Sequence, residues 1–125
     1  MGRIIIISTG SVNLEAELYD TSTADAVWNT LPYEARGRTW GEELYFSIPV
    51  ELELEPENEQ DVVEVGDLGY WPAGNAFCVF YGPTPASMDE RPKPASPVTV
   101  FGKVLGDATE LSGVEAGVVF VTRKE

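Results

Sequence analysis

The 125-residue sequence contains no histidine and only one cysteine, Cys78. Without histidine, the chain lacks the base of Ser-His and Cys-His nucleophilic pairs and the commonest metal ligand of proteins. A single cysteine excludes an internal disulfide and any zinc site built from several cysteines. We therefore expect no metal and no cofactor, and we expect Cys78, inside an apolar run, to act as a small hydrophobic residue.

Lysine and arginine are also scarce. Eight basic residues oppose twenty-one acidic ones, which gives a net charge of −13, and no basic residue occurs between Arg38 and Arg91. Nucleic-acid binding depends on basic side chains that contact phosphates, so this composition argues against a nucleic-acid partner. No apolar run approaches the ~20 residues of a membrane span. We expect a cytoplasmic protein that does not bind membranes.

The length and the 43% apolar content predict a single domain over residues 1–125 that is large enough to bury a core. Short apolar or alternating runs predict a strand hairpin over residues 4–19 and a helix that begins near Thr21 and ends at Pro32. Further strands are expected over residues 33–40, 43–48, 77–81, 98–105 and 117–122. This succession of short strands with one or two helices predicts a mainly β fold, a closed barrel capped by helix.

Glutamates occupy every second position from Glu51 to Glu59. A period of two places their carboxylates on one face of an extended chain. A calcium site would need ligands that converge from a curved loop, and this stretch has no such turn. The pattern therefore predicts a solvated strand face that runs into an exposed loop.

Proline is concentrated in residues 82–97, which contain five of the nine prolines. Proline cannot donate a backbone hydrogen bond, so this segment cannot be a central strand. Long irregular segments inside a compact domain usually have a function. We expect either a mobile flap over a binding site or an ordered loop beside one.

Aromatic residues cluster in residues 69–85, which include Tyr70, Trp71, Phe77, Phe80 and Tyr81. Alternation from residue 77 to residue 81 predicts a strand with apolar side chains on both of its faces. Both faces should therefore be covered by other parts of the chain. Aromatic side chains held between turns are typical of a pocket in a small β protein.

Several motifs resemble those of the cyclophilins. Residues 100–104, Val-Phe-Gly-Lys-Val, match a strand of that family, and residues 17–24 are similar to its entry into the first helix. Residues 40–46, 70–85 and 96–103 resemble more closely a family of small prokaryotic cyclophilin-like proteins. This resemblance covers almost the whole chain. It implies a closed eight-stranded antiparallel β-barrel with a short helix at each open end, in a family whose function is not established.

Cyclophilins are prolyl isomerases, which seat proline in an apolar pocket and use an arginine to polarise the amide bond. Their F-H-R-I-I-P segment corresponds to residues 45–50 here, where Ile48 stands in place of the arginine. Ala76, Cys78 and Val98 replace further residues of the isomerase groove. The resemblance therefore implies a groove without its catalytic arginine, and we expect no efficient isomerase activity.

Our leading hypothesis is a binding protein whose partner is a small molecule or a proline-containing peptide. The candidate groove combines aromatic side chains with polar groups that could orient a ligand. Of the aromatic residues, Phe46, Phe77 and Phe101 are the strongest candidates for the core. The candidate groove residues are Trp40, Glu43, Tyr45, Tyr70, Trp71, Asn75, Phe77, Phe80, Tyr81 and Thr84.

Two enzymatic alternatives stay open, and catalytic residues are unknown. A groove alone could isomerise prolyl bonds weakly, with Arg36 or Arg38 as a substitute cation. Glu42 and Glu43 could instead act as acid and base on a small molecule. Neighbouring residues of a strand point to opposite faces, so at most one of these two carboxyls reaches a given pocket. A raised pKa of either carboxyl would favour this alternative. The sequence does not determine the oligomeric state.

Overall fold

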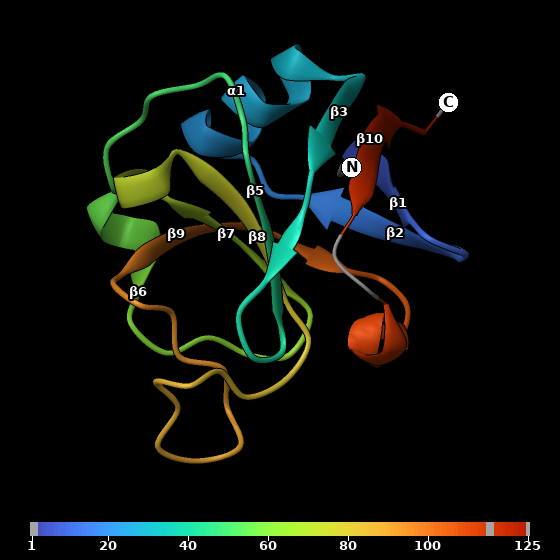
Figure 1. Ribbon diagram of the computed structural model, residues 1–125. Helices are drawn as coiled ribbons and strands as arrows, with labels where there is room; N and C mark the ends of the chain where they lie inside the picture. Colours follow the sequence, from blue (N-terminus) through green and yellow to red (C-terminus); the bar gives the residue numbers. More distant parts are fainter. Residues whose placement is uncertain (1–2, 115–116, 125) are drawn as a thin grey trace.

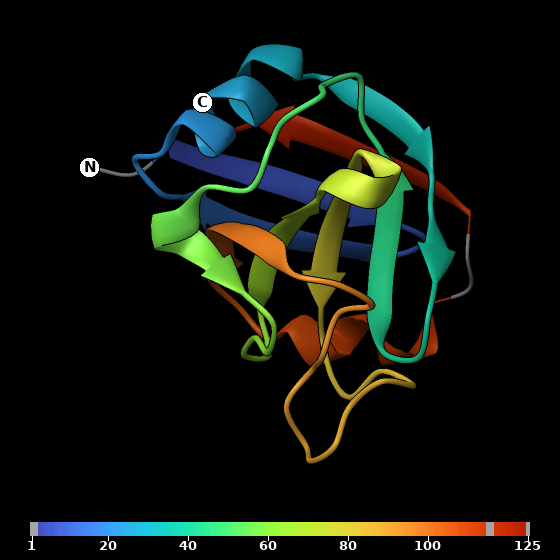
Figure 2. The same ribbon diagram turned by 90° about the vertical axis from the view of Figure 1, so that its left-hand side faces the viewer.

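The computed structural model describes residues 3–114 and 117–124, which form one ten-stranded antiparallel sheet (Figures 1 and 2). Both views place the helix α1 (Ser22–Thr30) at one end of the sheet and the short 3-10 helix η3 (Ala108–Gly113) at the opposite end. Two further 3-10 helices are η1 (Pro56–Asn58) and η2 (Pro72–Gly74). The strands are β1 (Arg3–Thr9), β2 (Val12–Leu18), β3 (Tyr33–Arg36), β4 (Arg38–Thr39), β5 (Glu43–Ser47), β6 (Glu59–Gln60), β7 (Asp67–Trp71), β8 (Ala76–Phe80), β9 (Val98–Val104) and β10 (Val118–Arg123).

The N-terminal hairpin and helix form where local sequence predicts them. β1 and β2 pair across Gly10, whose φ of +57° suits a tight turn. The Thr21 side chain caps α1 by accepting a hydrogen bond from the Ala24 N–H at 3.0 Å, and the helix ends before Pro32. Among the residues that the structure describes, no helix has the length and apolar character required to cross a membrane.

The sheet differs from the expected closed eight-stranded barrel. Its strand order is β3-β10-β1-β2-β9-β7-β8-β5-β4, with β6 paired to β9, and these pairings leave β3 and β4 at the two edges. Closure of the barrel is therefore not confirmed within the described residues. The two edge strands are consecutive in the chain and are separated by Gly37 alone. A Cβ atom there would lie 2.7 Å from a methyl group of Val119 and 3.0 Å from one of Leu44, so glycine divides the run predicted as one strand.

Apolar side chains pack on both faces of β8, as its alternation predicts. The inner cluster is centred on Phe77, which stacks on Phe46 with ring centroids 4.8 Å apart and meets Phe101 edge-on at 5.1 Å. All three rings are buried, which confirms their assignment to the core. An outer cluster on the opposite face contains the buried side chains of Val63, Ala76, Cys78, Phe80 and Val98.

Residues 50–55 belong to no strand, although a strand face was expected there. The buried Tyr70 hydroxyl accepts a hydrogen bond from the Leu52 N–H at 3.1 Å and donates one to the Val50 carbonyl at 3.0 Å. Further along, the Glu55 carboxylate accepts hydrogen bonds from the backbone N–H and the hydroxyl of Thr23 at the start of α1. Hydrogen bonds with Tyr70 and Thr23, rather than with a neighbouring strand, therefore hold this segment in place.

Candidate functional site

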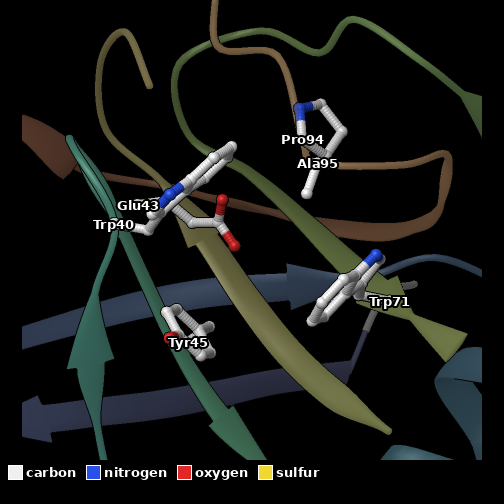
Figure 3. Close-up of a pocket in the computed structure, with 6 residues that line it drawn as sticks. All are labelled: Trp40, Glu43, Tyr45, Trp71, Pro94 and Ala95. Atoms are coloured by element: carbon white, nitrogen blue, oxygen red, sulfur yellow. The ribbon is translucent and has the colours of Figure 1, made fainter. Parts of the chain in front are cut away.

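A pocket of about 220 Å³ lies on the outer face of the sheet (Figure 3). Its lining combines three aromatic side chains, one carboxyl group and two small apolar residues of the proline-rich loop. Figure 3 shows the Glu43 carboxyl projecting from β5 into the space between the three aromatic rings. The lining residues are Trp40, Glu43, Tyr45, Trp71, Pro94 and Ala95.

The strand period of two places Glu43 and Tyr45 in the pocket. Alternate residues of β5 point to opposite faces, and Leu44 and Phe46 are buried in the inner cluster. Glu43 and Tyr45 therefore face outward beside their β8 partners Phe80 and Cys78. The floor of the pocket belongs to the outer cluster.

A tight turn between β4 and β5 presents Trp40. The Trp40 N–H donates a hydrogen bond to the Glu43 carbonyl at 2.9 Å, and Gly41 between them adopts a φ of +60°. A Cβ atom at Gly41 would lie 2.7 Å from Pro85 and 2.8 Å from the backbone of Thr84. Glycine is therefore required both for the turn and for its close packing against the proline-rich loop.

The proline-rich loop, residues 82–97, is cross-linked by two hydroxyl groups. The Thr84 hydroxyl donates to the Lys93 carbonyl, and the Ser87 hydroxyl donates to the Arg91 carbonyl at 2.8 Å and accepts from the Lys93 N–H at 3.1 Å. These bonds join the two arms of the loop. Of the two expected alternatives, they favour an ordered loop, and it supplies Pro94 and Ala95 to the pocket.

A side-chain hydrogen bond connects this loop to the opposite wall of the pocket. The indole N–H of Trp71, at the end of β7, donates to the hydroxyl of Ser96. This bond restrains the Trp71 side chain, whose ring lines the pocket.

The Glu43 carboxyl is the buried polar group of the site. The residue is 6% exposed, and its Oε1 atom is buried without a hydrogen-bond partner among the described residues. Burial raises the pKa of Glu43 from its ordinary value of 4.5 to about 7, and the neighbouring Cys78 thiol partly opposes this shift. Burial, reinforced by the charge of Glu43, also raises the pKa of Cys78, so this thiol is unsuited to act as a nucleophile.

Near neutral pH the pocket can therefore offer either a neutral carboxylic acid or a carboxylate. The neutral form both donates and accepts hydrogen bonds, whereas the ionised form accepts only. No group of three or more acidic or cysteine side chains converges as metal ligands within residues 3–114 and 117–124.

The pocket brings together four of the ten candidate residues inferred from sequence: Trp40, Glu43, Tyr45 and Trp71. Phe80 lies in the outer cluster, and Thr84 is buried as a cross-link of the loop. Asn75 lies in the left-handed conformation at the end of η2, and its Oδ1 atom lies 3.3 Å from the Tyr70 hydroxyl. The other three residues belong to the inner cluster: Tyr70, Phe77 and Tyr81.

Sequence reasoning did not single out Pro94 and Ala95, and it paired Glu42 with Glu43. The sequence signal that could have identified Pro94 and Ala95 was the expectation that the proline-rich loop lies over or beside a binding site. Glu42 is absent from the lining of the pocket. Its side chain instead lies against Gly82, where a Cβ atom would overlap the Glu42 carboxyl. Only one of the two carboxyls therefore reaches the pocket, as expected, although Glu42 lies in the turn before β5 and not in the strand itself.

The fold and the pocket define an antiparallel β protein with a candidate ligand site on the outer face of its sheet. The chain belongs to the cyclophilin-like family, since a sequence model of that family, described as Cyclophilin-like, matches residues 3–122. It is also similar to a solved structure, the solution structure of the hypothetical protein AF2241 from Archaeoglobus fulgidus. That chain is 36% identical with a TM-score of 0.81, and the match covers 98% of this chain and 95% of that one. No curated protein matches this chain.

Proposed function

We propose that this protein binds a small ligand, or a small apolar group of a peptide, in the pocket around Glu43. The observation that carries the proposal is the buried Glu43 carboxyl, whose Oε1 atom has no partner among the described residues, within an aromatic pocket. An unpaired polar atom in apolar surroundings costs free energy. A ligand that hydrogen-bonds to this carboxyl would offset the cost while its apolar surface packs on the rings.

The arrangement of cations supports binding rather than efficient prolyl isomerisation. Ile48, which stands where cyclophilins have their arginine, is 6% exposed and packs in the inner cluster. Arg38 of β4 is paired with Tyr45, so it extends from the pocket's face of the sheet, but it does not line the pocket. In the part of the chain that the structure describes, no basic side chain lines this pocket to polarise an amide.

We would test binding by NMR with isotopically labelled protein, using an Ala-Pro dipeptide and the neutral compound 3,3-dimethyl-1-butanol as probes. We expect saturable shifts of amides near residues 40–45, 71 and 94–95. Trp71→Ala should abolish these shifts and keep the dispersed spectrum of a folded protein. Phe120→Ala, which alters an exposed ring on β10, serves as the control and should bind normally.

Two outcomes of this experiment would count against the proposal. Absence of pocket shifts with both compounds would contradict a binding function of this pocket. Cis–trans exchange peaks of the dipeptide that depend on catalytic amounts of protein would instead favour isomerase activity, with Arg38 as the first residue to replace.

A second candidate function is acid–base chemistry on the bound ligand, because the raised pKa of Glu43 lies near neutral pH. A general acid or base works best when its pKa matches the operating pH. The carbon-13 shift of the Glu43 carboxyl, followed through a pH titration, tests this candidate. A midpoint near 7 supports it, and a midpoint near the ordinary value of 4.5 contradicts it.

A further inference from the structure

We propose that the ligand of this pocket is a cation, specifically an alkylated ammonium group. The proposal rests on the binding function proposed above and names the chemical class of its ligand. It depends on the combination, in the same small pocket, of three aromatic rings with one buried carboxyl group whose Oε1 atom has no hydrogen-bond partner among the described residues.

The aromatic rings come from three separate places in the fold and line the same pocket. Trp40 extends from the turn before β5, Tyr45 from β5 itself and Trp71 from the end of β7 (Figure 3). Aromatic faces carry partial negative charge, and tryptophan and tyrosine attract cations most strongly. An alkylated ammonium group suits such a site because its methyl groups contact the rings while its charge is shared among them.

The Glu43 carboxyl adds the charge that such a ligand needs. Among the described residues it is the sole carboxyl group in the lining, and no lysine or arginine belongs to that lining. Its Oε1 atom has no hydrogen-bond partner among the described residues, and the Cys78 thiol only partly opposes the raised pKa, so the ionised carboxylate is incompletely compensated. A bound cation would stabilise the ionised form directly, whereas an anion would be repelled by it and by the net charge of −13.

The size of the pocket limits which part of a ligand it can hold. Its volume of about 220 Å³ is smaller than the range of about 300–1,000 Å³ typical of sites for drug-sized molecules. The pocket therefore suits a compact cationic headgroup rather than a whole extended molecule.

Binding of a cation would be coupled to the protonation of Glu43. The cation favours the carboxylate, so its affinity should rise as the pH increases through the pKa of about 7 in the free protein. Lys93 also lies on the loop that supplies Pro94, but it does not line the pocket. The other ionisable side chains on this face of the sheet are Arg38, Tyr45, Cys78, and Asp67 with its β9 partner Lys103.

The test compares choline with 3,3-dimethyl-1-butanol, which has the same shape without the charge. Titrations at pH 8 should show choline binding at least about tenfold more tightly than the neutral alcohol. Lowering the pH to about 5.5 should weaken choline binding by about tenfold or more and leave the alcohol nearly unaffected. Calorimetry in two buffers of different ionisation enthalpy should show proton release when choline binds near pH 7.

Two variants separate the pocket carboxyl from the general acidity of the protein. Glu43→Gln should remove both the preference for choline and its pH dependence while the alcohol still binds. Glu42→Gln removes the same charge one residue away and should keep both properties.

The outcomes distinguish this inference from the binding function on which it rests. Equal affinity for choline and the alcohol would overturn the cationic ligand and leave a neutral-ligand pocket. Failure of both compounds to bind would overturn the two together. If Glu43→Gln does not fold, proton release on choline binding to the unmodified protein tests the proposal instead. Binding of choline without proton release near pH 7 would contradict it.

Discussion

Burial of the Glu43 carboxyl links the stability of this protein to pH. In the unfolded chain Glu43 should titrate near its ordinary pKa of 4.5, whereas in the folded protein its pKa is about 7. Between these values the folded state holds more protons than the unfolded state, so the free energy of unfolding falls as the pH rises. The loss begins near pH 4.5 and is complete above pH 7.

Replacing Glu43 with Gln should remove this loss. We expect Glu43→Gln to unfold with a free energy close to that of the parent protein at pH 4 and about 2–3 kcal/mol higher at pH 8. Urea unfolding at both pH values measures the difference. Glu42→Gln is the control and should not gain stability selectively at pH 8. An equal pH response of Glu43→Gln and the parent protein would mean that Glu43 ionises in the folded state as easily as in water.

At the scale of single elements, the N-terminus of α1 depends on a residue more than thirty positions away in the chain. Glu55 accepts two hydrogen bonds from Thr23, one from its N–H at 3.1 Å and one from its hydroxyl. A carboxylate at this position also interacts favourably with the partial positive charge at the start of a helix. The helix is therefore capped locally by Thr21 and from a distance by Glu55.

Glu55→Gln should lower the free energy of unfolding by about 1 kcal/mol, because an amide is a weaker acceptor and carries no charge. Glu53→Gln removes the same charge from an exposed position two residues away and should change stability much less. Urea unfolding of both variants makes the comparison. Equal effects would show that loss of charge alone, without the contact to Thr23, explains the result.

The proline-rich loop is an element whose order depends on side chains. Thr84 is 7% exposed, and besides donating to the Lys93 carbonyl its hydroxyl accepts a hydrogen bond from the Ala86 N–H at 3.2 Å. These bonds replace the backbone ladder that its prolines cannot form.

Thr84→Val keeps the shape of the side chain and removes the hydroxyl. We expect it to cost about 1–3 kcal/mol of stability and to increase hydrogen exchange in residues 84–95, because buried polar groups lose their partner. Thr39→Val on the exposed strand β4 is the control. Unchanged exchange in the loop would mean that packing rather than the hydroxyl orders it.

For the whole molecule, charge repulsion opposes folding. Twenty-one acidic and eight basic residues are confined to one compact chain. The ion pairs found between described residues, such as Arg3–Asp25 and Lys124–Glu15, are partly exposed and contribute little. Repulsion between like charges is stronger in the folded state, where they are closer together, and salt screens it.

Raising NaCl from about 10 mM to about 500 mM should therefore increase the midpoint of urea unfolding. The double variant Glu51→Lys/Glu57→Lys changes the net charge by +4, from −13 to −9, at exposed positions. Its midpoint should be higher at low salt and should respond less to added NaCl. A midpoint that is independent of salt in both proteins would contradict the role of repulsion.

Local patterns in the sequence determined much of this protein. The period of two in β5 and β8 fixed which side chains share a face of the sheet. Glu43 is therefore on the same face as Tyr45, and Phe77 and Phe80 are on opposite faces. The hydroxyl of Thr21 and the proline at position 32 fixed both ends of α1. These features depend on residues a few positions apart, where backbone geometry alone relates them. Long motifs likewise sufficed to predict the family.

Only the tertiary structure decided which residues meet across the chain. It buried Tyr70 and Tyr81 in the inner cluster, joined Trp71 to Ser96, and placed Pro94 in the lining of the pocket. It also left the sheet edges at β3 and β4 without a pairing between them. The physical reason is that strand alternation determines which face of the sheet a side chain is on, but not which distant segments of the chain pack against that face. The raised pKa of Glu43 depends on this packing, because every segment around the carboxyl contributes to its desolvation.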